Sequence, residues 1–329
     1  MPACRRAFWV LGLLVLLGLA SLAVALAAGS IAVPLADVFA ALTGGDAPQA
    51  AIVRELRLPR ALAGFAVGGL LALAGCLMQV LLRNPLADPY VLGISGGAGV
   101  GSLIAMLLGF SSFGVPGLAF LGALAAMLVV FGLAHGVGGW TQTRLLLTGV
   151  VVAAGCGAVV ALILTVAPEH KIHGMLFWLM GDLSQAGAAL LPLLMLAVAL
   201  GAALPFAREL NLLARGAAQA ASLGVSVSRL RLIVYVVASL ATAVAVTTAG
   251  SIGFVGLIVP HLMRLSIGPR MGNDQRLLLP AAALAGGSLL VLADTAARTV
   301  VAPMQLPVGV LTALIGVPVF LYLLSRGRK

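Results

Sequence analysis

The chain is poor in charge. Of its 329 residues only 9% are Asp, Glu, Lys or Arg, whereas 62% are hydrophobic. A soluble chain has roughly a quarter of its residues charged. Glycine is abundant by contrast, and the 41 glycines are spread through apolar runs, as in helices that pack closely in lipid. The composition excludes a soluble globular protein and predicts an all-α, polytopic membrane protein.

Lysine and cysteine are also rare. The only lysines are Lys171 and Lys329, and no G-x-x-x-x-G-K-[ST] sequence occurs, which excludes a nucleotide-hydrolysing loop in this chain. The three cysteines have no CxxC or paired spacing, so they indicate neither a disulfide nor a metal site. His170 and His173 are three residues apart, but no third ligand is evident, and a solvated loop is favoured over a metal site. We expect no metal and no cofactor in this chain.

Acidic residues are missing from the middle of every apolar run. The nine Asp and Glu all fall in connections or at the ends of runs. Ion-coupled carriers usually hold an ionisable residue near the middle of the bilayer, so this pattern favours energy supplied by a partner. An ion-coupled secondary transporter remains the alternative. An intramembrane enzyme would need a reactive triad or metal cluster within the spans, and none is present.

The apolar runs, bounded by Arg, Pro, Gly or Asp, predict about ten membrane passes in one domain that covers residues 1–329. The expected spans are Phe8–Ala28, Leu58–Leu82, Tyr90–Leu108, Val115–His135, Arg144–Ala167, Ala188–Phe206, Arg229–Gly250, Phe254–Ile267, Leu277–Thr295 and Val308–Ser325. Because Phe254–Ile267 is short and contains Pro260, we expect a half-span covered by protein. The first run follows two arginines, as in a signal peptide, but its length of about 20 residues favours a retained span.

Basic residues are concentrated in alternate connections. If the N-terminus is inside, the inner segments hold fourteen of them: Arg5, Arg6, Arg83, Arg144, Arg208, Arg215, Arg229, Arg231, Arg264, Arg270, Arg276, Arg326, Arg328 and Lys329. The outer segments hold five: Arg54, Arg57, Arg60, Lys171 and Arg298. This bias places both termini in the cytoplasm. It also accounts for the net charge of +10 without a nucleic-acid partner.

Two connections are longer than simple turns: an outer loop at 32–59 and an inner segment at 207–228. The inner segment has apolar residues close to a helical period, with a glycine break at Gly216: Leu210, Leu213, Ala217, Ala220 and Leu223. This pattern predicts two short amphipathic helices on the cytoplasmic face. A protein partner is favoured over a lipid surface because no Lys or Trp flanks them.

A proline-containing turn, Arg83–Pro89, precedes the glycine-rich run Gly93–Gly101. A phosphate-binding loop is not supported, because the run opens a membrane span and has no lysine nearby. Small residues recur every four positions, at Gly93, Gly97 and Gly101, which predicts one helix face for close packing.

Three outer arginines, Arg57, Arg60 and Arg298, oppose the charge bias. Long side chains that anchor at the lipid interface would explain them. So would an outward basic patch that binds an acidic protein surface. Composition and position leave both explanations open.

Several strings in the chain together resemble the FecCD or cobalamin-importer type of permease, the membrane subunit of type II ABC importers. They run in order from residue 57 to residue 320. They are Arg57-Leu-Pro-Arg60, Ala74-Gly75 with Gln79, Arg83-Asn-Pro-Leu-Ala-Asp-Pro89, Leu92-Gly-Ile-Ser95, Ser222-Leu-Gly-Val225, Gly253-Phe-Val-Gly-Leu-Ile-Val-Pro-His261 with Arg264, Asp294 with Arg298, Leu306-Pro-Val-Gly309 and Gly316-Val-Pro-Val-Phe320.

The resemblance implies a homodimer of ten-helix subunits in the bacterial inner membrane, with an inverted repeat relating the second to fifth spans to the seventh to tenth. It implies two cytoplasmic ABC ATPase subunits, which hold ATP and Mg, and a periplasmic substrate-binding protein. The chain itself would be non-catalytic. The cargo would be a metal chelate, most commonly a ferric siderophore, or haem or cobalamin, and an oxyanion is a further alternative.

The resemblance also implies roles for individual residues. Arg57, Arg60 and Arg298 match arginines that dock the binding protein. Gln142 and Thr143 fall at a cytoplasmic gate. The ATPase-coupling set is Leu210, Leu213, Gly216, Ala220, Ser222, Leu223 and Gly224. Two positions depart from the family pattern: Ala217 and Gln305 stand where an acidic residue is usual. They put the polar detail of the two docking surfaces in doubt.

Overall fold

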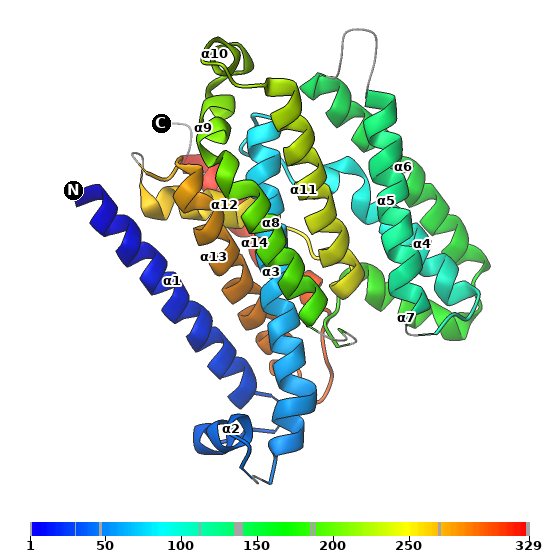
Figure 1. Cartoon of the computed structure of the whole chain (residues 1–329). Coiled ribbons are helices and arrows are strands. Elements are labelled where there is room, and N and C mark those ends of the chain that lie inside the picture. The colour runs from blue at the N-terminus through cyan, green and yellow to red at the C-terminus, as the bar shows by residue number, and fades with distance from the viewer. Residues whose placement is uncertain are drawn as a thin grey trace.

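The computed structural model describes residues 2–29, 31–45, 48–111, 113–134, 141–184, 186, 189–268 and 271–326. Within these residues the chain is helical and contains no strand. Ten helices form the bundle in Figure 1: α1 (Pro2–Ala27), α3 (Leu58–Leu81), α4 (Ile94–Leu107), α5 (Gly114–Ala134), α6 (Gln142–Val166), α8 (Leu190–Ala203), α11 (Val227–Ala249), α12 (Val255–Ile267), α13 (Gln275–Ala297) and α14 (Val308–Arg326).

These helices confirm the expected spans. Seven are long and apolar enough to cross a membrane, and α4, α12 and α14 are shorter apolar helices. Each of the ten overlaps one run predicted from the sequence. The match is close because a backbone in lipid must satisfy its hydrogen bonds internally, so every long apolar run becomes a helix.

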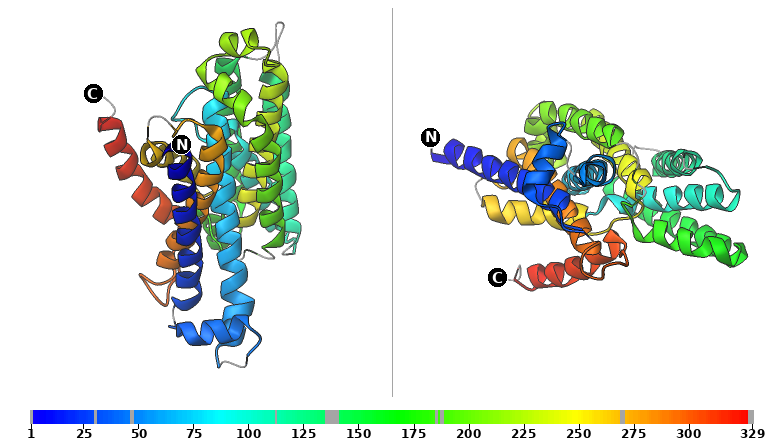
Figure 2. Two further views of the ribbon diagram at one scale, coloured as in Figure 1. Left: turned by 60° about the vertical axis from the view of Figure 1, so that its left-hand side comes forward. Right: turned by 90° about the horizontal axis from the view of Figure 1, so that it is seen from below.

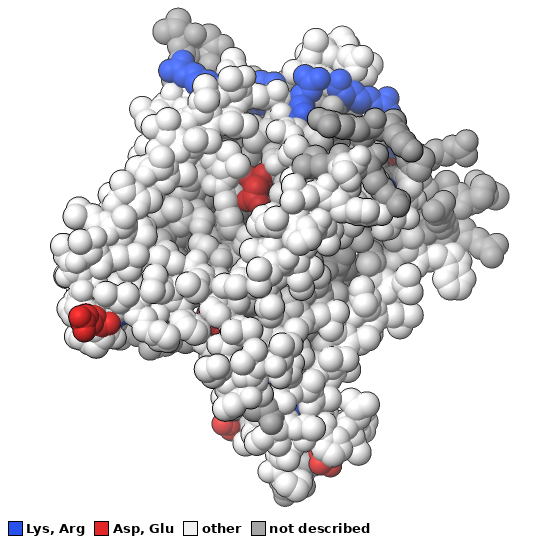
Figure 3. Space-filling view, turned by 180° about the vertical axis from the view of Figure 1, so that it is seen from behind, with Lys and Arg blue, Asp and Glu red and all other residues white. Residues whose placement is uncertain are grey.

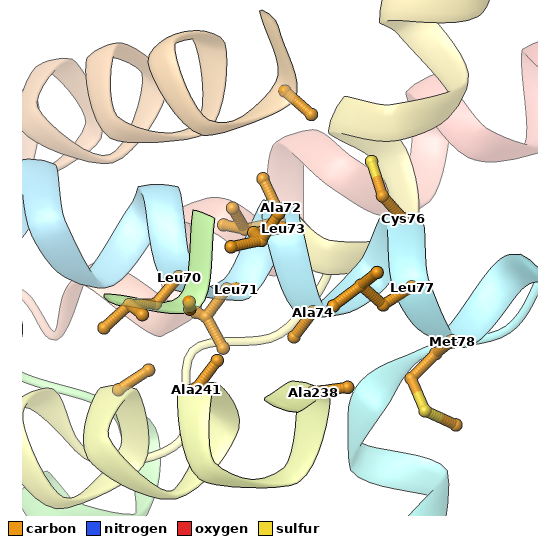
Figure 4. Close-up of a cluster of buried hydrophobic side chains, with 14 of the residues drawn as sticks. Leu70, Leu71, Ala72, Leu73, Ala74, Cys76, Leu77, Met78, Ala238 and Ala241 are labelled. Atoms are coloured by element: carbon orange, nitrogen blue, oxygen red, sulfur yellow. The ribbon is translucent and has the colours of Figure 1, made fainter. Parts of the chain in front are cut away.

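Helix α3 is the centre of the bundle. It packs against α8, α11, α12 and α13. In the most apolar 18-residue stretch of Ile52–Leu81, 89% of the residues are buried. Figure 4 shows its leucine and alanine side chains among those of α11, including Ala238 and Ala241. A Cβ on Gly75 would lie 1.9 Å from the carbonyl oxygen of Gly256, so only glycine allows α3 and α12 to approach this closely.

The remaining helices lie on two sides of α3. Helices α4, α5 and α6 form one group, while α1, α12, α13 and α14 lie on the other side (Figures 1 and 2). In the first group α4 packs on α5 through the predicted glycine face. A Cβ on Gly97 would lie 2.3 Å from the Gly122 carbonyl oxygen, and one on Gly101 would lie 2.1 Å from that of Leu118. The close-packing prediction is therefore confirmed, and Gly93 faces α6 instead.

Two spans are interrupted at matching places. The chain after α3 forms a short 3-10 helix, η2 (Pro89–Leu92), and turns through Gly93 at φ +74° into the short α4. The chain leaves α11 through Gly250 at φ +68°, has no regular structure through residue 253, and turns through Phe254 at φ +69° into the short α12. Helix α12 lies against α3 and α13, as expected for a half-span covered by protein.

Two polar connections contain more helix than the sequence indicated. The outer loop 32–59 includes α2 (Leu35–Leu42) and a π-helix, η1 (Ile52–Arg57), which runs directly into α3. The stretch that begins at Glu169 is not a solvated loop but helix α7 (Glu169–Met180). The loop prediction was wrong because it weighed the polar first turn alone. The later apolar residues bury Met175 beside Leu103 and Ile163.

The molecule has two polar ends. The α10 end carries the start of α1, the turn after α3 and the short helices α9 (Ala207–Arg215) and α10 (Ala217–Ser222). The α2 end carries α2, α7 and the connection from α13 to α14 (Figures 1 and 2). Seen from behind, Lys and Arg gather at the α10 end, and most of the flank between the ends is uncharged (Figure 3). The charge asymmetry read from the sequence is thus a spatial one.

Candidate docking and gating sites

Helices α9 and α10 are joined by a sharp break at Gly216. Its φ of +149° and ψ of 142° lie in a region that glycine alone adopts freely, so the helix must end here. Asn211 on α9 donates through Nδ2 to Oδ1 of Asp274 at 2.9 Å, and its own Oδ1 accepts from the backbone N–H of Gln275 at 2.9 Å. These bonds fix α9 to the start of α13. The two short helices and the glycine break predicted for this segment are confirmed.

The seven residues of the expected coupling set divide into two groups. Leu210, Leu213 and Ala220 are completely buried and Gly216 is buried, so they hold the segment against its own bundle. The side chain of Leu223 is 66% exposed, and Ser222 and Gly224 beside it are exposed too. Helical periodicity marks an apolar face but does not say what covers it. Only the second group is available to a partner.

Two of the three outer arginines, Arg60 and Arg298, pair with the carboxylate of Asp294. Arg60 donates through Nη2 to Oδ1 of Asp294 at 2.8 Å and through Nε to Oδ2 at 3.0 Å, while its Nη1 donates to Oε1 of Gln305 at 2.9 Å. Arg298 Nε forms an ion pair with the same Asp294 Oδ2 at 3.3 Å, and its Nη2 donates to the Ala25 carbonyl at 2.9 Å. Arg60 therefore ties α3 to both ends of the α13–α14 connection, through Asp294 and Gln305.

Arg57 does not reach the surface. Its Nη1 donates to the carbonyl oxygens of Leu26 and Ala27 at 2.7 and 3.0 Å, and its Nη2 donates to that of Ile31 at 2.5 Å. The residue is 6% exposed and closes the turn after α1. A Cβ on Gly29 would lie 2.6 Å from this guanidinium, which explains the glycine there.

The three arginines are thus structural groups first. The side chains of Arg60 and Arg298 are 13% and 10% exposed, and that of Asp294 is 5% exposed. Burial lowers the pKa of the Arg298 guanidinium, and the neighbouring Asp294 carboxylate opposes that shift. The sequence reasoning placed Asp294 at a span end and grouped it with Arg298, but it did not foresee that Arg60, 234 residues away, shares the carboxylate. The spacing of four residues between Asp294 and Arg298 on one helix was the available signal for their pair.

The two residues expected at the gate lie at the start of α6. Thr141 caps this helix, since its Oγ1 accepts from the Arg144 backbone N–H at 3.2 Å. Gln142 donates through Nε2 to the Leu81 carbonyl at 2.9 Å, which links α6 to the last turn of α3. Thr143 is exposed at the α10 end. The pair lies at the α10 end, and of the two only Gln142 makes a described contact between helices; the gate role stays a prediction.

A polar contact joins the two interrupted spans. The Tyr90 hydroxyl donates to the Ile252 carbonyl and accepts from the Ile252 N–H, both at 3.0 Å. The hydroxyls of Ser95 and Ser251 are 2.6 Å apart. The backbone groups freed at one interruption are thereby satisfied by the other, as membrane depth requires. Sequence reasoning missed this contact because it joins residues far apart in the chain.

Each polar end contains a cavity. One of about 930 Å³ at the α2 end is lined by residues that include His173, Phe177, Trp178, Asp182 and Gln305. One of about 650 Å³ at the α10 end lies beneath α9. Among the described residues no group of three or more His, Cys, Asp or Glu is arranged to hold a metal ion. Both cavities have polar side chains in their lining, and the described residues include no cluster of metal ligands.

These features define a class: a multi-pass membrane protein with interrupted spans, a helical projection at one end and buried ion pairs at the other. Residues 13–326 match the model of the FecCD transport family. The chain is 45% identical to the cobalamin import system permease of Halobacterium salinarum, over 84% of this chain and 74% of that protein. It is 43% identical to the hemin transport permease of Yersinia pestis, over 84% and 82%.

A solved structure has a similar fold. It is described as an inward-facing metal-chelate-type ABC transporter, with 30% identity and a TM-score of 0.83 over 97% of this chain and 99% of that one. The chain belongs to the FecCD transport family. It is a permease subunit of an ATP-binding-cassette importer.

Proposed function

We propose that this permease imports a metal chelate, with a ferric siderophore, haem or cobalamin as the candidate cargo. Two similar proteins are named for cobalamin and hemin, and the similar solved structure is described as a metal-chelate transporter. The fit of the bundle to that structure over nearly its whole length carries the proposal.

The α10 end faces the cytoplasm in this proposal. Arginines gather there, and cytoplasmic connections of membrane proteins carry the excess of Lys and Arg. Both chain termini then lie in the cytoplasm, and the protein lies in the bacterial inner membrane. Partner ATPase subunits supply ATP and Mg, and this chain contributes no catalytic chemistry.

The ATPase docks on the exposed tip of the coupling segment, Ser222, Leu223 and Gly224. An exposed leucine on a projecting helix end is a suitable apolar anchor for a cleft on a partner. The buried residues Leu210, Leu213 and Ala220 transmit the movement of the ATPase to the bundle, because they attach α9 and α10 to it. ATPase closure then tilts α8 and α11, the helices that flank the segment.

The binding protein docks at the α2 end on Arg60 and Arg298. An acidic side chain of the partner would compete with Asp294 for these guanidiniums, so docking and the ion pairs within the chain are linked. Arg57 supports this surface from beneath by holding the turn after α1.

A second copy of the chain completes the path. In the most apolar 18-residue stretch of α6 only 11% of the residues are buried. The exposed residues of this helix include Leu147, Val151 and Leu162. Helix α14 exposes Leu314, Ile315 and Leu321. Lipid would cover such faces equally well, but the importer architecture pairs two permease subunits around one path.

The cargo is tested by competition. The permease is reconstituted into liposomes with its ATPase, and uptake through its binding protein is measured for ferric siderophore, haem and cobalamin. We expect one of these chelates to be taken up with ATP and to be displaced by its own unlabelled form. Uptake of none of the three, with a free amino acid or sugar transported instead, would contradict a chelate cargo.

A further inference from the structure

The cavity of about 650 Å³ at the α10 end is lined by four separate segments of the chain. The end of α3 and its following turn contribute Gln79 and Arg83, and α9 contributes Asn211 and Arg215. Helix α12 contributes His261 and Arg264, and the start of α13 contributes residues 273–275. Three guanidinium groups and one imidazole therefore share one cavity with a single acid, Asp274.

The arginines of this cavity have no ion-pair partner among the described residues. Every ion pair that the structure describes involves Arg60 or Arg298, at the opposite end. Arg264 donates through Nη1 to Oε1 of Gln79 at 2.5 Å, which occupies one edge of its guanidinium. The Asp274 Oδ1 is already occupied by Asn211 and by the Arg276 backbone N–H. The cavity keeps an excess of positive charge.

A second observation points to an absent ligand. Gln275 lines the cavity, is 2% exposed, and its Oε1 is buried without a hydrogen-bond partner. A buried amide atom without a partner is uncommon in a folded protein. Rotation of the amide by 180° presents its N–H₂ instead, so this group can serve an acceptor as well as a donor.

We propose that this cavity binds the phosphate group of an anionic ligand. Planar guanidinium groups make paired, charge-assisted hydrogen bonds to phosphate oxygens, and three arginines line this cavity, from α9, α12 and the turn after α3. The phosphate is that of an anionic phospholipid headgroup or of a free phosphate compound. Basic pockets between membrane helices on the cytoplasmic side are typical headgroup sites.

The ligand would connect the coupling segment to the bundle. Arg215 is the last residue of α9, directly before the break at Gly216, whereas Arg83 and Arg264 belong to the α3 turn and α12. A phosphate held by all three restrains α9 relative to α12. If the coupling role under the proposed function is correct, occupancy changes how strongly ATPase movement reaches the bundle. Binding itself does not depend on that role.

Binding is tested with the full-length purified protein. Native mass spectrometry measures retention of phosphatidylglycerol against phosphatidylcholine, and thermal stability is followed as inorganic phosphate is added. The test variant is the double change Arg83→Gln and Arg215→Gln, since both residues are exposed and their replacement leaves the core intact. The matched control is Arg144→Gln, an exposed arginine at the same end outside the cavity.

We expect the double variant to bind at least about ten-fold more weakly while Arg144→Gln binds as the wild type does. The Lys-for-Arg double variant should recover part of the affinity, which shows that charge and not folding is measured. A loss confined to phosphatidylglycerol identifies a lipid site, and a loss confined to inorganic phosphate identifies a soluble ligand. Equal binding by the wild type and the double variant in both assays would overturn the proposal.

Discussion

Within each proposed docking surface, some residues hold the surface in place and others are exposed to a partner. At the α10 end the buried leucines of α9 hold the coupling segment, and exposed Leu223 is free for a partner. At the α2 end Arg57 donates its hydrogen bonds to backbone carbonyls, and Arg60 and Arg298 both pair with Asp294. A motif that names a function thus contains residues that position and residues that contact. Exposure separates them.

Leu223→Asp tests the contact role. A charge at the exposed tip should prevent apolar docking without disturbing the bundle, because the side chain is 66% exposed. We expect ATPase stimulation by cargo to fall about ten-fold or more, as for loss of an apolar anchor at a hot spot, with unchanged membrane insertion. ATPase rates in proteoliposomes measure this.

Leu86→Asp is the matched control. It lies at the same end and is 41% exposed, but it is not part of the coupling segment. It should retain the wild-type stimulation. If Leu223→Asp also stimulates normally, the segment does not contact the ATPase through its tip.

A double-mutant cycle tests the shared carboxylate. Asp294→Asn leaves the largely buried Arg298 without its counter-charge and leaves Arg60 with only the longer pair to Asp182 at 3.9 Å, so we expect a loss of about 3–5 kcal/mol in unfolding free energy. Arg60→Gln together with Asp294→Asn should cost less than the sum of the single changes, because each removes the same pair. Thermal unfolding in detergent gives the four stabilities. Additive losses would mean that the pair contributes nothing.

At the scale of helices, small residues decide how closely elements approach. The glycine period on α4 could be read from the sequence because spacing along one helix is local information. The partner of each glycine could not, since α3 meets α12 through residues about 180 positions apart. For the same reason the contact between Tyr90 and Ile252 was not foreseen. Helix α7 was missed because a polar first turn concealed a buried apolar face.

Gly75→Ala tests the approach of α3 to α12. The added Cβ would lie 1.9 Å from a backbone oxygen, which cannot move without separating the two helices. We expect a loss of about 1–3 kcal/mol or more in stability, the range for overpacking a core. The melting temperature in detergent measures it.

Gly201→Ala on α8 is the same substitution where nothing lies within 4 Å. It should leave stability unchanged or raise it slightly, because alanine favours a helix. Equal melting temperatures for the two variants would mean that α3 and α12 are not packed as described.

At the scale of the whole molecule, hydropathy and charge were sufficient for the architecture. Long apolar runs become helices in lipid whatever their neighbours, so the ten spans followed from composition and punctuation. The short α12 was recognised from its length and Pro260. Which residues contact a partner did not follow, because burial is settled by tertiary packing. Leu210, Leu213 and Ala220 are the clearest examples.

The whole molecule also explains the energy source. The described acidic residues are located at helix ends and connections, and Asp294, the most buried of them, is paired with arginines. No described carboxylate is free at mid-span to carry a coupling proton. This agrees with an importer that is driven by partner ATPase subunits, and the projecting α9–α10 segment is where we propose that the movement is imposed.

The most direct measurement of this account is transport with the two energy sources separated. Proteoliposomes containing the permease and its ATPase receive the loaded binding protein, first with ATP and collapsed ion gradients, then with a proton gradient and no ATP. We predict uptake of the chelate in the first condition and none in the second. Uptake that persists without ATP and follows the proton gradient would contradict the central claim.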